Sequence, residues 1–340
     1  MRKTLRYFIP AFSLMLSGCL QPTANLNAGD EPDWLRGESS SYPNSQYLYA
    51  TGSASRPEQA KDRALGNLVK IFELHLEESS TTTQDVQSHR TGDEEAVTAT
   101  ARVASRVNIR TDKMIQGARI AEQWQSPTDL TYYALAVLER DQAGNNIRSE
   151  IKKIDDETEV KLQQANSRLE PLRQVGDLQD ALDLQIQRDS LQKTLKIIDL
   201  QGKGMPPHWN HAELEERLDG ALRAMRMSAA VTRDDAGELG QMLQAAMAAA
   251  GFSNQSTGGY ILSAALASDD VLQRQGWFWL RGTLSLRLTA ADGTVLGNRS
   301  WPLKVSALQQ EQLNSRMRAE VDKKLKQELM SSVLGFANGG

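Results

Sequence analysis

The segment "YLYATGSASRPEQAKDRALGNLVKIF", residues 47–72, contains the clearest evidence for how the first part of the chain folds. Residues 47–54 alternate and carry aromatic side chains, which is typical of a β-strand. Ser55 can cap a helix whose first turn contains Pro57. Apolar residues then recur at helical spacing, namely Ala60, Ala64, Leu65, Leu68 and Phe72. A strand followed at once by an amphipathic helix predicts a helix that packs on a sheet.

The segments that follow this stretch predict the rest of a first unit. We expect a second strand at 73–82, a polar loop at 84–94 and a helix at 95–112. Residues 116–125 and 130–139 predict a β-hairpin whose "SPTD" turn contains a proline in a suitable position. Together these elements predict a small α+β domain at residues 34–140, with a helical layer on one sheet.

Several parts of this domain resemble a known family. Trp34, Tyr42-Pro43, "YLYATGSAS" and the closing "GARIAEQWQSPTDLTYYALAVLER" are similar to the Lpp-twenty-type outer-membrane lipoprotein family, over roughly residues 33–140. The resemblance implies an outer-membrane lipoprotein, and some family members are parts of flagellar outer-membrane structures. It implies no catalytic residues.

Residues 141–200 predict two long helices that fold back on each other as a helical hairpin. Apolar residues recur at three-four spacing from Ile147 to Ile198, and "QVGD" at 174–177 interrupts the pattern. Gly176 suits a helix end and Asp177 suits the next cap. The mixed charges favour a solvated face, and partner binding along that face is the alternative.

The last part of the chain predicts a second α+β domain. Residues 201–210, rich in glycine and proline, predict a linker, and Asn210 with Glu213 predicts a capped helix start at the beginning of a domain at 211–340. The expected helices are 211–226, 236–250 and 308–334, and the expected strands are 228–232, 259–268, 276–290 and 294–306. The overall prediction is an α+β fold with helices on two mainly antiparallel sheets.

The N-terminus contains the only cysteine of the chain, within "SLMLSGCLQP" at 13–22. A basic start, an apolar run of about ten residues and small residues at its end predict a signal peptide at residues 1–18. The sequence Leu16-Ser17-Gly18-Cys19 resembles the lipobox of bacterial lipoproteins, in which the cysteine is acylated and the preceding peptide is removed. The alternative is a chance cysteine in an ordinary signal peptide.

The resemblance to a lipobox implies a lipid anchor at Cys19, with acyl chains such as palmitate, followed by a flexible tether at 19–33. Several acyl chains together hold a protein on a membrane almost irreversibly. In such lipoproteins an aspartate after the cysteine usually means retention in the inner membrane. Leu20 occupies that position here. We therefore expect an outer-membrane location with the chain facing the periplasm.

Charge and composition exclude several classes of partner. Without Arg2, Lys3 and Arg6 the chain keeps 36 basic residues against 43 acidic ones, a net charge of −7. This balance argues against a nucleic-acid binder, which needs a basic surface. Aromatic residues make up only 6% of the chain, which argues against a stacking platform.

Candidate chemical motifs have structural explanations. His208 and His211 have the spacing of a zinc site but no third ligand nearby, and Ser190 with Lys193 matches S-x-x-K without its companion motifs. The adjacent acidic pairs lie in polar segments and usually cap helices or face water. These pairs are Glu94-Glu95, Asp155-Asp156, Asp234-Asp235 and Asp269-Asp270. We therefore expect no enzymatic activity, no metal and no cofactor.

The segment "GWFWLRG", residues 276–282, is the strongest candidate for partner contact. As a strand it places Trp277 and Trp279 on one face and Phe278 on the other. The favoured interpretation packs these rings under helices, and the alternative is an exposed aromatic edge that docks a partner protein.

We expect a non-catalytic outer-membrane lipoprotein that acts through protein–protein contacts in the envelope or in flagellar outer-membrane assembly. A lipoprotein activator of peptidoglycan synthases is the alternative within this class. An envelope hydrolase is the alternative from another class, and a cleft with converging histidine, serine or carboxylate side chains would favour it.

Overall fold

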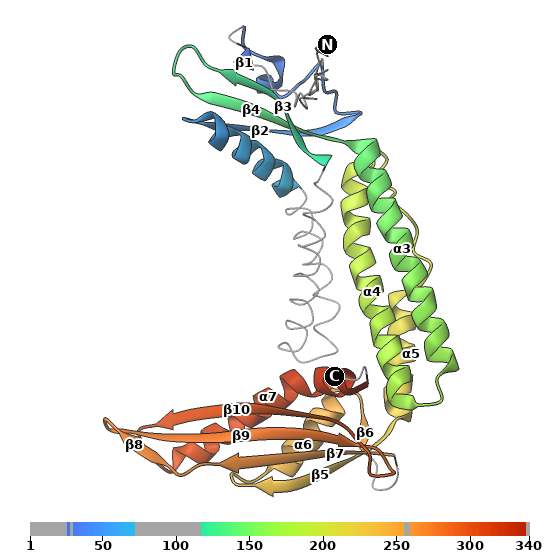
Figure 1. The fold of residues 1–340 in the computed structure, drawn as a ribbon, viewed down its shortest axis with the longest axis vertical. Helices are drawn as coiled ribbons and strands as arrows, with labels where there is room; N and C mark the ends of the chain where they lie inside the picture. The colour runs from blue at the N-terminus through green and yellow to red at the C-terminus, as the bar shows by residue number, and fades with distance from the viewer. Residues whose placement is uncertain (1–25, 28–29, 72–116, 255–258, 338–340) are drawn as a thin grey trace, which may run out of the picture.

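The computed structural model describes residues 26–27, 30–71, 117–254 and 259–337. Two β-sheets lie at opposite ends of a long helical hairpin, so the described residues form a C (Figure 1). This arrangement confirms the predicted α+β fold. The strand predicted at 73–82 and the helix predicted at 95–112 lie outside the described residues.

The first sheet contains four strands in the order β1-β3-β4-β2. They are β1 (Leu26–Asn27), β2 (Tyr47–Ala54), β3 (Arg119–Gln125) and β4 (Tyr132–Glu139). Strand β4 pairs antiparallel with both β2 and β3, and the short β1 runs parallel to β3. The strand predicted at 47–54 and the hairpin predicted before residue 140 are confirmed.

A helix over residues 57–71 packs on β2 because Gly52 leaves room for it. A Cβ atom at Gly52 would lie 2.2 Å from the backbone nitrogen of Ala64 and 2.4 Å from the carbonyl oxygen of Ala60. The helix buries Ala60, Ala64 and Leu68, so the apolar spacing of the sequence marks the face that packs.

The same helix covers part of the free edge of β2. Arg63 Nη1 donates a hydrogen bond of 2.6 Å to the carbonyl of Ser53, and Asn67 Nδ2 donates one of 2.9 Å to the carbonyl of Thr51. An edge strand with free backbone groups can pair with another chain. These two side chains therefore leave less of the β2 edge available for such pairing.

An aromatic cluster covers the other face of the first sheet. Trp34, in the 3₁₀-helix η1 (Asp33–Arg36), is 1% exposed and packs with Trp124, Leu135 and Val137. Its indole Nε1 donates a hydrogen bond of 2.8 Å to Glu122 on β3. The polar tip of the buried ring therefore has a partner, as burial of an indole requires.

The helical hairpin consists of α3 (Arg140–Ser167) and α4 (Pro171–Ile198). The predicted break at 174–177 is wrong, because α3 ends before Arg168 and α4 begins at Pro171. Glu170 caps α4 by accepting hydrogen bonds from the backbone nitrogens of Leu172 and Arg173. Proline suits the first helical position because the backbone N–H that it lacks would have no partner within the helix. Glu170 and Pro171 therefore together fix the start of α4.

Gly176 and Asp177 lie inside α4 and are buried. Asp177 does not cap a helix, because its Oδ2 accepts a hydrogen bond of 2.8 Å from Arg168 Nε at the end of α3. The ion pair joins the two helices beside their turn. Asp177 therefore serves a contact between the two helices, although Gly176-Asp177 has the sequence of a helix boundary.

The second sheet has strands in the order β10-β9-β7-β5-β6, and β8 pairs with β9. The strands are β5 (Arg226–Asp234), β6 (Ser253–Asn254), β7 (Tyr260–Ser268), β8 (Leu272–Arg274), β9 (Trp277–Thr289) and β10 (Val295–Ala307). The helices of this part are α5 (His211–Ala224), α6 (Leu239–Ala249) and α7 (Gln312–Ala337). Asn210 Oδ1 accepts a hydrogen bond of 3.0 Å from the backbone nitrogen of Ala212, which confirms the predicted cap of α5.

The second sheet is mainly antiparallel, as predicted, but it also contains parallel pairs that the sequence did not predict. Strand β5 runs parallel to β6 and to β7, and only β7, β8, β9 and β10 form antiparallel pairs. The reason is the connection after β5. The chain returns through α6 before it enters β6 and β7, and such a crossover brings consecutive strands into parallel pairs.

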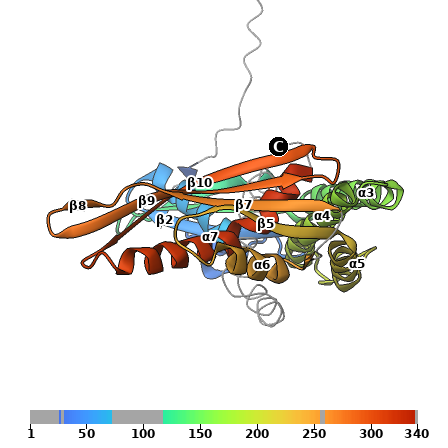
Figure 2. The same cartoon turned by 90° about the horizontal axis from the view of Figure 1, so that it is seen from below.

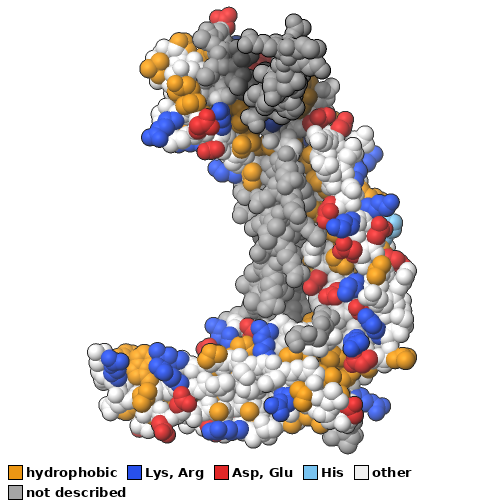
Figure 3. Space-filling model, viewed as in Figure 1, with side chains coloured by type: hydrophobic (Ala, Val, Ile, Leu, Met, Phe, Trp, Pro, Cys, Tyr) orange, Lys and Arg blue, Asp and Glu red, His pale blue; other side chains and the backbone are white. Residues whose placement is uncertain are grey.

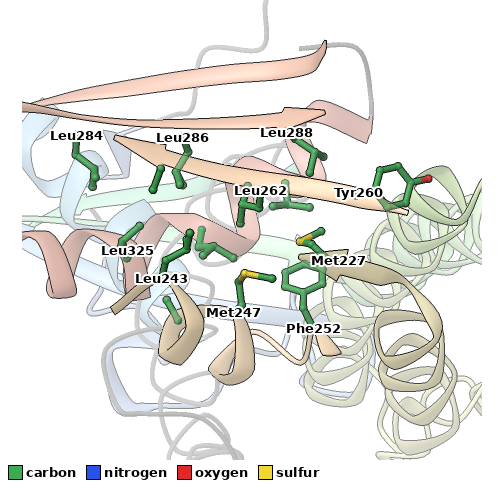
Figure 4. Packing of buried hydrophobic residues seen from close by; sticks show 14 of the residues in the cluster. Met227, Leu243, Met247, Phe252, Tyr260, Leu262, Leu284, Leu286, Leu288 and Leu325 are labelled. Atoms are coloured by element: carbon green, nitrogen blue, oxygen red, sulfur yellow. The ribbon is translucent and has the colours of Figure 1, made fainter. Parts of the chain in front are cut away.

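Helices α6 and α7 lie along one side of the second sheet (Figure 2). Leu262 on β7 and Leu286 on β9 point from the sheet toward Leu243 on α6 and Leu325 on α7, and all four are fully buried (Figure 4). Even-numbered positions of β7 and β9 face this core. Odd-numbered positions of both strands therefore face the other side, where none of the described helices packs.

Candidate interaction site

The predicted contact residues Trp277, Phe278 and Trp279 begin β9 and form a short hairpin with β8. In the register, Leu272 is opposite Trp279, Gln273 is opposite Phe278 and Arg274 is opposite Trp277. Gln275 and Gly276 join the strands with positive φ angles of 51° and 78°, the conformation that a two-residue type I′ turn requires. The hairpin lies at the end of the second sheet farthest from α3 and α4 (Figure 1).

This hairpin carries exposed apolar side chains, which we call the hairpin end: Val271, Leu272 and Trp277. Their exposed fractions are 38%, 55% and 40%. Leu272 and Trp277 lie on the side that α6 and α7 leave open. Exposed apolar side chains that cluster indicate an interaction site more strongly than isolated ones.

The three aromatic residues divide between the two faces as predicted. Phe278 is half-buried and packs against the core under α6 and α7. Trp277 and Trp279 lie on the open side, and Trp279 stacks with Lys304 of β10, whose Nζ is 4.4 Å from the ring centroid. Only Phe278 therefore meets the interpretation in which the rings pack under helices.

A buried polar cluster lies between α3, α4 and the linker at 201–210. Arg188, 0% exposed, donates a hydrogen bond of 2.8 Å to Asp155 Oδ1 through Nε and another of 2.8 Å to the carbonyl of Pro206 through Nη2. The Gln185 side chain also donates to Asp155 and to Thr158. The cluster attaches the linker to the hairpin.

Asp155 corrects the prediction for the acidic pair Asp155-Asp156. The sequence suggested that adjacent carboxylates in a polar segment face water, but Asp155 is only 6% exposed. A charge removed from water needs a paired and hydrogen-bonded partner, and α4 supplies it as Arg188, 33 residues away in the sequence. No local pattern in the sequence marks Arg188 as a residue that lies between two helices.

A second polar contact joins the hairpin to the second sheet. The Tyr260 hydroxyl at the start of β7 donates a hydrogen bond to Glu170 Oε1, the cap of α4. Burial, together with this hydrogen bond to a carboxylate, raises the pKa of Tyr260 to about 12. The neutral phenol is therefore the form that the contact favours.

The histidine and serine motifs do not form a catalytic arrangement among the described residues. His211 Nε2 lies 3.4 Å from Asp189 Oδ2, and His208 stacks at an angle beside Trp209. Within the part of the chain that the structure describes, no three metal-binding side chains form a group. Ser190 lies on α4, where its hydroxyl donates to the carbonyl of Ile186 in its own helix, and burial lowers the pKa of Lys193.

Of the other acidic pairs, Asp234-Asp235 makes contacts in the fold, Asp269-Asp270 is exposed to water, and one pair lies outside the described residues. Asp234 accepts hydrogen bonds from the backbone nitrogens of Gly237 and Leu239 at the start of α6. Asp235 pairs with Arg233 at 2.7 Å, which lowers the pKa of Asp235. Glu94-Glu95 and the predicted lipidation site Cys19 lie outside the described residues.

A shallow groove of about 550 Å³ runs between α3 and α4. Charges of both signs line it, together with Val160, which is 50% exposed. Lys161 crosses the groove, with Nζ 2.6 Å from Asp180 Oδ2, and this hydrogen bond raises the pKa of Lys161. Four carboxylates and two lysines line the groove, so it is mildly acidic, and the Lys161–Asp180 pair neutralises only part of this charge.

Residues 32–139 match the family model described as LPP20 lipoprotein. This range agrees with the resemblance found over residues 33–140, so the prediction for the N-terminal third is confirmed. The match ends where α3 begins, and the hairpin and the second sheet lie beyond it. None of the described helices is both long enough and apolar enough to cross a bilayer.

Two solved structures show how far the likeness to other proteins extends. The secreted protein HP1454 from Helicobacter pylori has a TM-score of 0.43 and 14% identity, and the match covers 85% of this chain and 98% of that one. A minor lipoprotein from Acinetobacter baumannii has a TM-score of 0.25 and 16% identity. That match covers 34% of this chain and 94% of the other one. TM-scores below 0.5 establish neither a shared fold nor a shared function. A comparison with curated proteins found no significant match.

Proposed function

We propose that this chain is an outer-membrane lipoprotein, anchored through Cys19, that acts without catalysis in the periplasm. Its action would be protein–protein contact in envelope or flagellar outer-membrane assembly. The family match over residues 32–139 supports the lipoprotein assignment. The C formed by the described residues would hold the second sheet, which lies beyond that match, away from the sheet nearest the anchor (Figure 1).

The observation that carries the proposal is the hairpin end. Val271, Leu272 and Trp277 expose apolar surface at the far end of the second sheet, although the neighbouring Phe278 is half-buried against the core. Water contact with apolar surface costs about 25 cal/mol per Å². A partner that covers the hairpin end would recover this free energy, and tryptophan is enriched among the residues that dominate protein interfaces.

A hydrolase remains the alternative from another class. It would need a nucleophile and a base within hydrogen-bond reach, whereas Ser190 donates to its own helix and His211 lies beside Asp189. Release of fragments from purified peptidoglycan by the mature chain would favour this alternative over our proposal.

Site-specific photo-crosslinking in intact cells tests the contact. We expect a photoreactive amino acid at Leu272 to form an adduct with an envelope protein. The same amino acid at Leu200, which is apolar and 64% exposed but distant in the fold, should form no such adduct. Identical adducts from both positions, or none from Leu272, would contradict the proposal. A peptidoglycan synthase in the adduct would support the activator alternative, and a flagellar ring protein would support the flagellar role.

The anchor is tested separately with Cys19→Ser. We expect this variant to be lost from the outer-membrane fraction, because it lacks the thiol that accepts the acyl chains. A serine variant that still sediments with the outer membrane would show that Cys19 is not the anchor.

A further inference from the structure

The face of the second sheet opposite α6 and α7 is uncovered by any described residue, and we call it the open face. Its members are the odd-numbered positions of β7 and β9 and the even-numbered positions of β10. Arg281, Arg287 and Lys304 are exposed on it. The positions between them are mainly small or hydroxyl-bearing, namely Ser263, Ala265, Ala267, Thr283, Ser285, Ser300 and Pro302. In Figure 3 the lower part of the molecule shows a largely white surface with blue side chains.

The strands of the second sheet are basic in a chain that is acidic overall. They contain seven lysine or arginine residues and one aspartate, whereas the whole chain has a net charge of −4. The basic residues are Arg226, Arg233, Arg274, Arg281, Arg287, Arg299 and Lys304. The aspartate, Asp234, is occupied by the cap of α6.

Two of these cations face each other on the open face. Arg281 and Lys304 are direct cross-strand partners in the β9–β10 register, and like charges in such pairs destabilise a sheet. Elsewhere Arg233 pairs with Asp235 and Arg299 pairs with Glu328. Among the described residues, neither member of the Arg281–Lys304 pair has an acidic partner within 4 Å. The free chain therefore tolerates a repulsion that an acidic partner would relieve.

We propose that the open face docks an acidic protein surface, with Arg281, Arg287 and Lys304 as its cationic contacts. This inference rests on the proposed function, because it names the chemistry of the protein partner. Trp279, stacked with Lys304, connects the open face with the hairpin end, so a single partner can cover both. Carboxylates beside Arg281 and Lys304 would convert the repulsion into two attractions.

The side chains of the open face favour a protein over a lipid surface. Each cation adds only about 1 kcal/mol to binding at an anionic membrane, and three cations therefore bind weakly. The centre of the open face offers hydroxyl groups, and Ser285 and Ser300 are already within hydrogen-bond distance of each other at 2.9 Å. Directional hydrogen bonds suit the shaped surface of a protein better than mobile headgroups.

Charge reversal tests the inference with the purified mature chain and defined probes. The probes are a fluorescent oligo-glutamate peptide and vesicles of phosphatidylethanolamine and phosphatidylglycerol. We expect the peptide to bind, with an affinity that falls as salt rises, and we expect Lys304→Glu and Arg287→Glu each to weaken binding about tenfold. Lys323→Glu makes the same charge change on α7, which covers the opposite face of the sheet, and should leave peptide binding unchanged.

The free chain provides a second readout. Lys304→Glu places a carboxylate opposite Arg281, so its Tm should not fall while its affinity for the peptide does. A folding defect would lower both together. Equal binding by Lys304→Glu and Lys323→Glu would overturn the inference. It would also be overturned by vesicle binding that depends on Lys304 when peptide binding does not, or by a dimer in sedimentation that Lys304→Glu abolishes. These outcomes would not affect the proposed function, which the crosslink from Leu272 and the Cys19→Ser variant test independently.

Discussion

At the scale of single residues, a missing side chain matters as much as any that is present. Gly52 has no Cβ, and the helix over residues 57–71 occupies the space that a Cβ would take. Only glycine allows a helix backbone to lie this close to a strand. The glycine inside "YLYATGSAS" is therefore explained by packing rather than by a turn.

This explanation predicts the effect of Gly52→Ala. The added methyl would meet the backbone at Ala60 and Ala64, so the helix must move, and overpacking of this kind costs about 3 kcal/mol. We expect the free energy of unfolding, measured by urea denaturation, to fall by about that amount.

Gly66→Ala is the matched control within the same helix. A Cβ at Gly66 has no neighbour within 4 Å, and alanine is favoured over glycine in a helix by about 1 kcal/mol. This substitution should therefore stabilise the chain. If both alanines change stability equally, the close approach at Gly52 does not hold the helix.

At the scale of elements, contacts between α3 and α4 stabilise the helical hairpin. The distribution of charged residues in the sequence does not reveal these contacts. The polar face of α3 looks solvated in the sequence, yet Asp155 is buried against Arg188 of α4. Arg188 also donates to the carbonyl of Pro206, so one side chain connects both helices and the linker. A contact across the hairpin also lies beside the turn between the helices. The Arg168–Asp177 pair joins the end of α3 to the first turns of α4, and Gly176 lies inside α4.

Removal of one partner of the buried pair should be costly. Arg188→Met leaves Asp155 as an uncompensated buried charge, and breaking such a pair costs about 3–5 kcal/mol. We expect a corresponding decrease in the free energy of unfolding and faster hydrogen exchange in residues 201–210, which lose the bonds to Met205 and Pro206.

The double variant Asp155→Leu/Arg188→Met provides the control. Apolar residues of similar volume can replace a buried ion pair with little loss, so the double variant should be more stable than Arg188→Met alone. Additive losses in this double-mutant cycle would show that Asp155 and Arg188 do not interact in the folded chain.

At the scale of the whole molecule, the hairpin takes part in two separate cores. Its end beside the first sheet packs in one apolar cluster, with Ile147 and Leu195, and its turn packs in the cluster under the second sheet, with Leu172 and Val175. The Tyr260–Glu170 contact lies at this second junction. The separation of the two sheets therefore depends on how both ends of the hairpin are packed.

The junction predicts a dependence of stability on alkaline pH. The folded pKa of Tyr260, about 12, lies above the ordinary value of 10.0, so the unfolded chain loses this proton first. The stability contributed by the neutral phenol is complete below pH 10 and is lost as the pH rises from about 10 to about 12. We expect the free energy of unfolding to fall more steeply across this window for the natural chain than for Tyr260→Phe. Parallel pH profiles would contradict the contact with Glu170.

Local patterns in the amino-acid sequence were sufficient to predict several helices and strands. The alternation at 47–54, the apolar spacing of Ala60, Ala64 and Leu68, and the hairpin that closes before residue 140 all appear in the structure, because period and turn chemistry depend on neighbouring residues. The aromatic residues at 277–279 divided between two faces for the same reason. The domain boundaries and the anchor at Cys19 stay predictions.

Which faces of these elements are covered depends on packing between segments that lie far apart in the sequence. The burial of Asp155 by Arg188, the parallel pairing of β5 with β7, and the repulsive pair Arg281–Lys304 each join residues from different elements. No local sequence pattern encodes these contacts, because they form only when helices and strands pack together. For the same reason, the sequence could propose Trp277 as a contact residue, but only the uncovered side of the second sheet placed it beside a basic surface.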